Sequence, residues 1–170
     1  FASAQKNFGI AGITCVLVNT KVLPESTGRV IPTIWNYRTH IENQSLYHTV
    51  PTFPVYVALL MLRWIKEQGG LVEMQRRSEA KANLIYQEID RNPLFEGIAV
   101  KEDRSILNAC FRGMSTEIDV QFLKYLTDNN VVGIKGFPTV GGFRASMYNG
   151  MPLESVTYLV ELMKSFKPEV

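Results

Sequence analysis

The segment GGFRASMYNGMPLESVTYLVELMKSF, residues 141–166, joins a strand pattern to a helix pattern and decides the fold class. Residues 142–148 are predicted to form a strand, and the last helix is predicted to run from Pro152 to about Phe166. Proline suits the first turn of a helix, where its missing N–H would have no partner in any case. The segment therefore predicts a strand that leads directly into a helix.

The same alternation extends upstream of this segment. Strands are expected near 98–102, 106–112 and 131–135, and a helix near 116–129 with Thr116 as its cap. Strands that alternate with helices, with some strands as antiparallel neighbours, indicate an α/β chain. Its C-terminal part is predicted to be an α+β layer, in which helices cover one face of a small sheet.

Two longer helices are predicted before this layer. The first runs from Thr52, its expected cap, to about Gln68, and Gly69-Gly70 ends it. The second runs from about Leu71 to Arg91 and is stopped by Pro93. The expected apolar faces comprise Val55, Leu59, Leu62, Trp64 and Ile65 in the first helix, and Leu71, Met74, Ala82, Ile85 and Ile89 in the second.

The first fifty residues are less regular. The run ITCVLVN, residues 13–19, is predicted to be a strand buried on both faces. Residues 24–54 are predicted to be a long loop, because four prolines and many polar residues interrupt them. Loops of this length inside compact domains are often functional. The four prolines are Pro24, Pro32, Pro51 and Pro54.

Composition limits the possible functions. With 170 residues, 46% of them hydrophobic, the chain can bury one sizeable core. The 18 basic and 16 acidic residues form no block of one sign, which argues against nucleic acid as a partner. Cys15 and Cys110 lie in apolar runs that suggest buried free thiols in a reducing cytoplasm. His40 and His48 have no further ligands at zinc spacing, and no apolar run is long enough for a membrane span.

A single lysine stands among small residues in FASAQKNFGIAG, residues 1–12. A lysine attacks a carbonyl only as the neutral amine, and Ala2, Ser3 and Ala4 would leave room for a bulky aldehyde cofactor. Lys6 is therefore a candidate catalytic residue; the alternative is a solvated lysine at a chain end. Because this stretch begins without methionine in a strand-like run, an upstream portion is expected to have been lost.

Three separated motifs resemble the phosphoserine aminotransferase family. They are SAQKNFGIAGITCVLV from Ser3, SLYHTVPTFPVYVALLMLRWIKEQGGL at 45–71, and the segment at 141–166, in the family's order. The resemblance implies the C-terminal portion of a pyridoxal-phosphate (PLP) enzyme with the aspartate-aminotransferase type of fold. It implies an incomplete large domain in residues 1–68, with the cofactor lysine and an inter-subunit loop, and a complete small domain in 69–170.

The resemblance also implies a reaction and its site residues. The enzyme would transfer an amino group from glutamate to 3-phosphohydroxypyruvate in serine biosynthesis, as a cytoplasmic homodimer associated through residues 39–54. Lys6 matches the lysine that forms the Schiff base and then moves the proton, and Gln5 matches a contact to the cofactor phosphate. His48 and Thr49 match a pair that reaches the neighbouring subunit's cofactor phosphate, and Arg144 matches the arginine that binds the substrate carboxylate.

Two departures from the family pattern bear on these expectations. The family generally has Gly-His-Arg where this chain has Gly136, Phe137 and Pro138, and neither Phe137 nor Pro138 can bind a substrate phosphate through its side chain. The pair at 48–49 is usually Asn-Thr in the family and is His-Thr here. The residues that stack on the cofactor ring and pair with its nitrogen lie upstream of the lysine in the family, so the chain alone is expected to be inactive.

Three hypotheses for the function remain open. The first is the phosphoserine transaminase, and the second is a related PLP enzyme with another substrate, which Phe137 and Pro138 favour. The third is a non-catalytic α+β interaction module. A cofactor-binding test separates the third hypothesis from the others, and assays with amino donors and keto acids separate the first two.

Overall fold

A computed structural model describes residues 1–23, 28 and 30–169. The chain forms two compact units, Phe1–Trp64 and Ile65–Val170, and the division falls inside helix α2. The sequence-based boundary follows Gln68, in the turn after the same helix, and its meaning as a domain limit stays a prediction.

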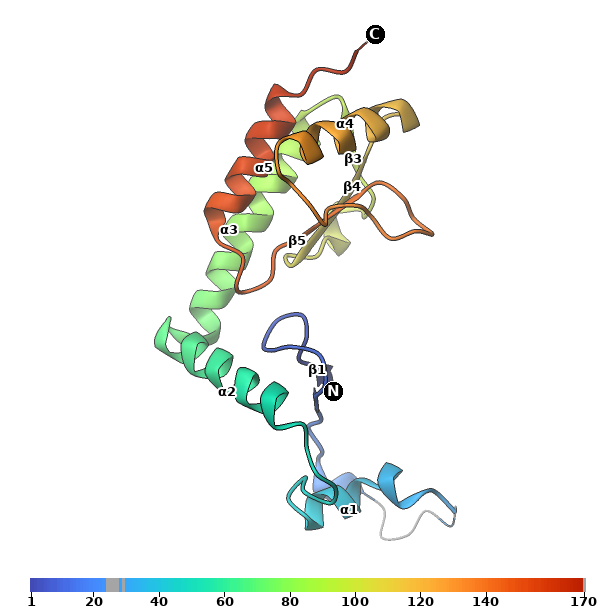
Figure 1. The fold of residues 1–170 in the computed structure, drawn as a ribbon, viewed down its shortest axis with the longest axis vertical. Helices are drawn as coiled ribbons and strands as arrows, with labels where there is room; N and C mark the ends of the chain where they lie inside the picture. Colours follow the sequence, from blue (N-terminus) through green and yellow to red (C-terminus); the bar gives the residue numbers. More distant parts are fainter. Residues whose placement is uncertain (24–27, 29, 170) are drawn as a thin grey trace. The chain divides into compact units, whose positions relative to one another are not determined.

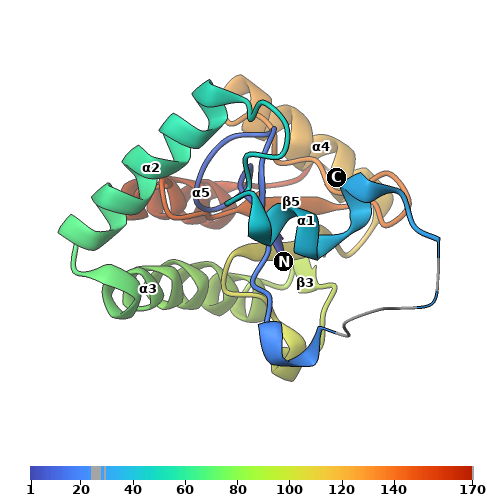
Figure 2. The same cartoon turned by 90° about the horizontal axis from the view of Figure 1, so that it is seen from below.

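The second unit is a three-stranded sheet packed against three helices. The strands pair antiparallel in the order β3-β4-β5, and β4 is central. Helices α3 and α5 lie side by side along their lengths in both views (Figure 1, Figure 2). The strands are Phe95–Gly97, Asn108–Gly113 and Phe143–Ser146, and the helices α3, α4 and α5 are Gly70–Arg91, Thr116–Asp128 and Leu153–Ser165.

The core of this unit lies on one face of the sheet. In β4, Ala109 and Phe111 are buried while Arg112 is exposed, as the two-residue period of a strand requires. Phe122 of α4 closes the core, with its ring centroid 4.7 Å from that of Phe95 and 5.2 Å from that of Phe143. The predicted α/β class, with a small sheet covered by helices on one face, is confirmed.

Helix α3 agrees with its predicted limits but buries less than expected. Gly69 and Gly70 both have positive φ, at 107° and 75°, which glycine adopts at little cost and which separates α2 from α3. The buried side of α3 begins only at Met74. Leu71, predicted to belong to the apolar face of this helix, is 82% exposed, because it lies in the first turn, ahead of the residues that pack on the sheet.

A buried ammonium joins α3 to the segment between β5 and α5. Lys81 is 2% exposed, and its Nζ donates hydrogen bonds to the carbonyl oxygens of Met147, Tyr148 and Met151 at 2.9, 2.9 and 3.0 Å. Burial lowers the pKa of Lys81, and the positive charge of Arg77 lowers it further. Three carbonyls satisfy the three donors of the ammonium and hold this turn against α3.

Three predictions for this unit need correction. The strand expected at 98–102 lies earlier in the chain: β3 ends at Gly97, and Lys101–Asp103 form a 3-10 helix. The strand expected at 131–135 is reduced to one bridge, Lys135 to Phe143, because Gly133 has φ of +73° and interrupts the extended run. The cap of α4 is Ser115, whose Oγ accepts from the Ile118 N–H at 3.3 Å; Thr116 is the first helical residue.

Acid is expected to weaken the second unit through Asp90. The Arg104 guanidinium, which binds both Asp90 oxygens at 2.7 and 3.0 Å, holds the pKa of Asp90 down to about 2 from 3.8. A carboxyl with a lowered folded-state pKa stabilises the fold above its unfolded pKa, and this stability is lost as the pH falls through the folded value. After allowance for solvent screening, we expect a loss of about 1 kcal/mol between pH 4 and 2.

Thermal unfolding between pH 2 and 7 tests this expectation. Asp90→Asn should be less stable at pH 7 and should depend less on pH below 4 than the unaltered protein. The matched control is Asp128→Asn, because the one ion pair of Asp128 among the described residues is an exposed i,i+4 pair with Lys124. Identical acid profiles of the Asp90→Asn and unaltered proteins would contradict the assignment.

The first unit contains a short hairpin and helices. Strand β1 pairs antiparallel with β2, with Ala2 opposite Cys15 and Ser3 opposite Thr14. Helix α1 begins after Asn36, whose Oδ1 accepts from the Arg38 N–H at 3.0 Å. The elements are β1 (Ala2–Ser3), β2 (Thr14–Cys15), 3-10 helices at Thr20–Val22 and Thr33–Trp35, α1 (Tyr37–Glu42) and α2 (Thr52–Glu67).

Two predictions for the first unit are wrong. The strand expected at 13–19 is only the two residues of β2, and it is exposed rather than buried: Leu17 is 90% exposed and Cys15 is exposed too. Among the described residues this strand pairs with β1 alone, and both of its residues are exposed. Cys110 is half-buried. The loop predicted at 24–54 contains α1, while Pro24 lies outside the described residues.

Helix α2 keeps its predicted length, although Thr52 is its first residue rather than a cap before it. Ala58 and Ile65 are buried, whereas Val55, Leu59 and Leu62 are 43%, 42% and 52% exposed. The apolar positions predicted from the sequence are therefore only partly covered. No helix in the described part of the chain is long and apolar enough to cross a membrane.

Candidate active site

Lys6 lies in a turn between the strands of the hairpin. The turn is fixed by the Ala4 N–H, which donates to the Ile13 carbonyl at 3.1 Å, and by the Phe8 N–H, which donates to the Ala4 carbonyl at 3.3 Å. Lys6 is exposed, and its ammonium has no ion pair or hydrogen bond among the described residues. An exposed amine without a partner is accessible to an aldehyde, so the residue fits a cofactor that carries one.

The small residues around Lys6 allow close packing of the turn in addition to leaving room for a cofactor. Ala4 is fully buried, and a Cβ placed on Gly9 would lie 3.0 Å from the Ala4 Cβ and 3.4 Å from the Ala58 Cβ. The turn therefore lies close against α2 at Gly9. Gln5 is exposed beside Lys6, so these two neighbours share one turn.

His48 and Thr49 lie in the irregular segment between α1 and α2. Both are exposed, and the His48 Nδ1 is 3.1 Å from the Thr49 carbonyl oxygen. The His40 ring lies edge-on to His48, with a centroid distance of 6.3 Å. In the described part of the chain, no hydrogen bond or ring contact joins His48 or Thr49 to Gln5 or Lys6, so the roles of all four residues stay predictions.

Arg144 is placed by β5 in the second unit. Its N–H donates to the Ile134 carbonyl at 2.7 Å, and it stands opposite Cys110 of β4. The side chain is half-buried, and its Nε is buried without a hydrogen-bond partner in the described structure. A guanidinium with an unused N–H donor can bind a carboxylate by donating to its oxygens.

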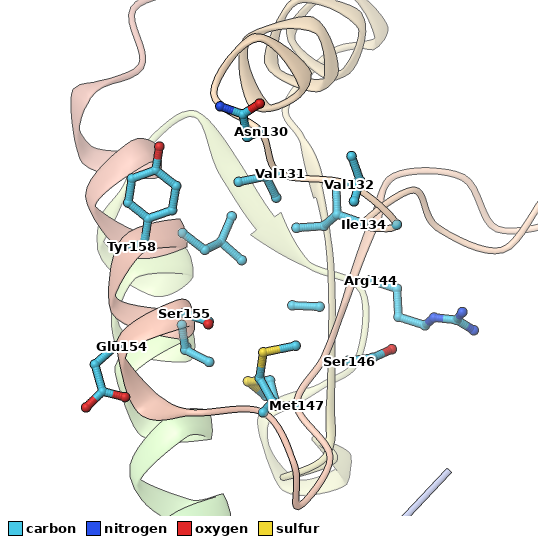
Figure 3. A pocket seen from close by; sticks show the side chains of 15 residues that line it. Asn130, Val131, Val132, Ile134, Arg144, Ser146, Met147, Glu154, Ser155 and Tyr158 are labelled. Carbon is cyan, nitrogen blue, oxygen red and sulfur yellow. The ribbon is translucent and has the colours of Figure 1, made fainter. Parts of the chain in front are cut away.

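A cavity of about 630 Å³ lies between β5, α5 and residues 130–134, on the side of β5 away from the Arg144 guanidinium. Figure 3 shows Val131 and Met147 directed toward the cavity, while the Arg144 guanidinium points away from it. The lining is mainly apolar. Arg144 and Ser146 belong to the β5 wall of the cavity, but the guanidinium that is the candidate carboxylate-binding group is directed away from it. Nothing in the sequence indicated the cavity.

The loop before β5 carries the departure from the family pattern at residues 136–138. The Gly136 N–H donates to the Gly142 carbonyl at 2.8 Å, which closes the loop, and Phe137 and Pro138 are exposed on it. A Cβ on Gly142 would lie 2.5 Å from the Phe111 carbonyl oxygen, so the close approach at this glycine is to β4.

Sequence reasoning missed a polar group on the Arg144 face of the sheet. Asn108, at the start of β4, accepts hydrogen bonds through Oδ1 from the Ser146 hydroxyl and the Tyr148 hydroxyl, both at 3.1 Å. Ser146 stands opposite Asn108 in the register of the strands. Nothing in the spacing of these residues along the chain indicates that they meet.

Comparison with known proteins places the chain in a family. The model of the family described as aminotransferase class-V matches residues 1–159. Phosphoserine aminotransferase from Bacteroides thetaiotaomicron is 49% identical over 170 residues, which cover 98% of this chain and 47% of that protein. The chain thus spans about half the length of the curated relatives it matches.

Solved structures agree with this assignment. A phosphoserine aminotransferase structure concerned with radiation damage of its Schiff base superposes with a TM-score of 0.91 and 41% identity, over 96% of this chain and 45% of that one. The PLP-bound phosphoserine aminotransferase from Trichomonas vaginalis gives a TM-score of 0.90 and 37% identity, over 96% of this chain and 47% of that one. By sequence match and by fold, the chain belongs to the class-V aminotransferase family.

Proposed function

We propose that the chain is part of a PLP-dependent phosphoserine aminotransferase, which transfers an amino group from glutamate to 3-phosphohydroxypyruvate. The observation that carries the proposal is Lys6: an exposed, unpartnered amine at a fixed turn, in a segment that the family matches. The relatives named phosphoserine aminotransferase support the reaction. In this proposal residues 1–68 end the large domain and 69–170 form the small domain. The enzyme would be cytoplasmic and would form a homodimer through residues 39–54.

The chemistry of each candidate residue suits a different role in this reaction. PLP, when bound, would supply the electron sink for the charge that develops at the substrate Cα. Lys6 would hold the cofactor through its aldehyde and, once released, take the proton from Cα on its Nζ. Gln5 would donate a hydrogen bond to the phosphate of the cofactor held by Lys6, and His48 and Thr49 would donate to the cofactor phosphate of the neighbouring subunit. Arg144 would bind the substrate carboxylate with two parallel N–H bonds.

Borohydride trapping with PLP, followed by peptide mass mapping of the full-length protein, tests the role of Lys6. Reduction should fix the cofactor to Lys6 alone. Lys21, an exposed lysine of the same unit, is the internal control and should remain unlabelled. Label on other lysines with none on Lys6, or no label at all, would leave the non-catalytic interaction module as the better interpretation.

Phe137 and Pro138 favour a second candidate, an aminotransferase with another keto acid as substrate. Both side chains are exposed on the loop before β5, and neither can donate a hydrogen bond to a phosphate. Comparing kcat/KM for 3-phosphohydroxypyruvate and hydroxypyruvate with glutamate as donor separates the candidates. A clear preference for the phosphorylated acid supports the first, and no preference supports the second.

A further inference from the structure

We propose that Asn108 is a positioning residue for Arg144, acting through the hydroxyls of Ser146 and Tyr148. The inference rests on the proposed function, in which Arg144 binds the substrate carboxylate, and it assigns a role to a group that does not itself touch substrate. The three polar residues would set where β5 holds the guanidinium.

The Arg144 side chain has no polar anchor of its own among the described residues. Its Nε is buried without a partner, and none of its other side-chain nitrogens makes a hydrogen bond or ion pair in the described part of the chain. The guanidinium is therefore positioned by the β5 backbone and by the side chains around it. A small shift of the strand would move the guanidinium with it.

Asn108 holds β5 from the face of the sheet that carries Arg144. In the register, Asn108 stands opposite Ser146 and Cys110 stands opposite Arg144, so all four positions share one face of the sheet. Figure 3 shows the Ser146 hydroxyl and the Arg144 guanidinium directed to the same side, away from the cavity. Ser146 is two residues from Arg144, which makes it the next side chain along that face.

The Asn108 amide oxygen binds two residues at the end of β5 at once. It accepts from the Ser146 Oγ within β5 and from the Tyr148 Oη just beyond it, both at 3.1 Å. The Lys81 ammonium holds the Tyr148 carbonyl from α3 at 2.9 Å. The end of β5 is thus held by the Asn108 amide oxygen on one side and by the Lys81 ammonium, which binds the Tyr148 carbonyl, on the other. Of these two groups, only Asn108 lies on the face of the sheet that carries Arg144.

The test uses full-length, cofactor-loaded protein and four variants. Asn108→Leu removes the acceptor, Ser146→Ala removes one donor, Ser146→Thr keeps it, and Arg144→Lys alters the proposed carboxylate site directly. The matched control is Tyr125→Phe, which loses a hydroxyl–hydroxyl bond of 3.0 Å to Ser165 elsewhere in the same unit. The readouts are KM and kcat for glutamate, and the Kd of glutarate by calorimetry.

Asn108→Leu should raise both KM and the glutarate Kd about tenfold, with a much smaller change in kcat, because displacement of a binding group weakens carboxylate binding first. Ser146→Ala should show part of this effect, and Ser146→Thr and Tyr125→Phe should resemble the unaltered protein. The double variant Asn108→Leu with Ser146→Ala should be no worse than Asn108→Leu alone, because the two residues act through one bond.

The failures can be told apart. If Arg144→Lys raises KM and Kd while Asn108→Leu and Ser146→Ala do not, or if these two lower only the melting temperature, the positioning role is wrong and the proposed function stands. If Arg144→Lys leaves KM and Kd unchanged, the carboxylate assignment fails and the inference fails with it. Should Asn108→Leu not fold, the contrast between Ser146→Ala and Ser146→Thr decides.

Discussion

Lys6→Ala is expected to lower kcat for transamination by about 10³-fold or more in the full-length protein, because it removes both the amine that holds the cofactor and the base that takes the proton from Cα. Lys6 lies exposed in the hairpin turn with no partner among the described residues, so its replacement removes no contact on which the fold depends. Without cofactor, the thermal stability of the variant should therefore stay close to that of the unaltered protein, because no difference in cofactor binding then enters the comparison.

Steady-state assays with glutamate as donor measure this loss, and Lys21→Ala is the matched control. Lys21 is another exposed lysine of the first unit, in the 3-10 helix Thr20–Val22, and its variant should keep full activity. A Lys6→Ala protein with more than about a tenth of the normal rate would be incompatible with a base role for Lys6.

Phe122→Ala is expected to reduce the free energy of unfolding of the second unit by about 3–5 kcal/mol, as large-to-small changes in aromatic cores do. Phe122 is fully buried, and its ring lies 4.7, 5.2 and 4.9 Å, centroid to centroid, from Phe95, Phe143 and Phe166. Its removal leaves a cavity at the point where α4, the sheet and the end of α5 meet.

Hydrogen exchange of the β4 and α4 amides measures this effect. Tryptophan fluorescence would not, because Trp35 and Trp64, the two tryptophans, both lie in the first unit. Val120→Ala on the same helix is the control, since Val120 is 65% exposed and surface changes usually stay within about 0.5 kcal/mol. Equal protection of β4 in the two variants would show that Phe122 does not close this core.

Periodicity and breakers predicted the long helices well. Gly69-Gly70 and Pro93 limit α3 to Gly70–Arg91, and Pro152 precedes α5, because glycine and proline act on the local backbone and need no distant partner. The short strands were predicted less well. A run such as residues 131–135 has strand-like composition, but whether it pairs depends on a neighbour far along the chain and on Gly133.

For the candidate site, the sequence supplied the residues through their motif context but not their surroundings. Gln5 and Lys6 are adjacent in the chain and share a turn, whereas the meeting of Asn108 with Ser146 and Tyr148 depends on the register of β4 and β5. Register is set by the pairing of whole strands, so residues 38 and 40 positions apart give no local signal.

The sequence by itself determined the family, the α/β class, the long helices and the lysine that stands among small residues. All of these follow from local composition, local breakers or contiguous motifs. Only the tertiary structure decided that residues 13–19 are mostly exposed, that the Lys81 ammonium is buried among three carbonyls, and that Arg144 shares a face with Asn108. These depend on which surfaces distant segments cover, and burial is a property of the packed chain rather than of any stretch within it.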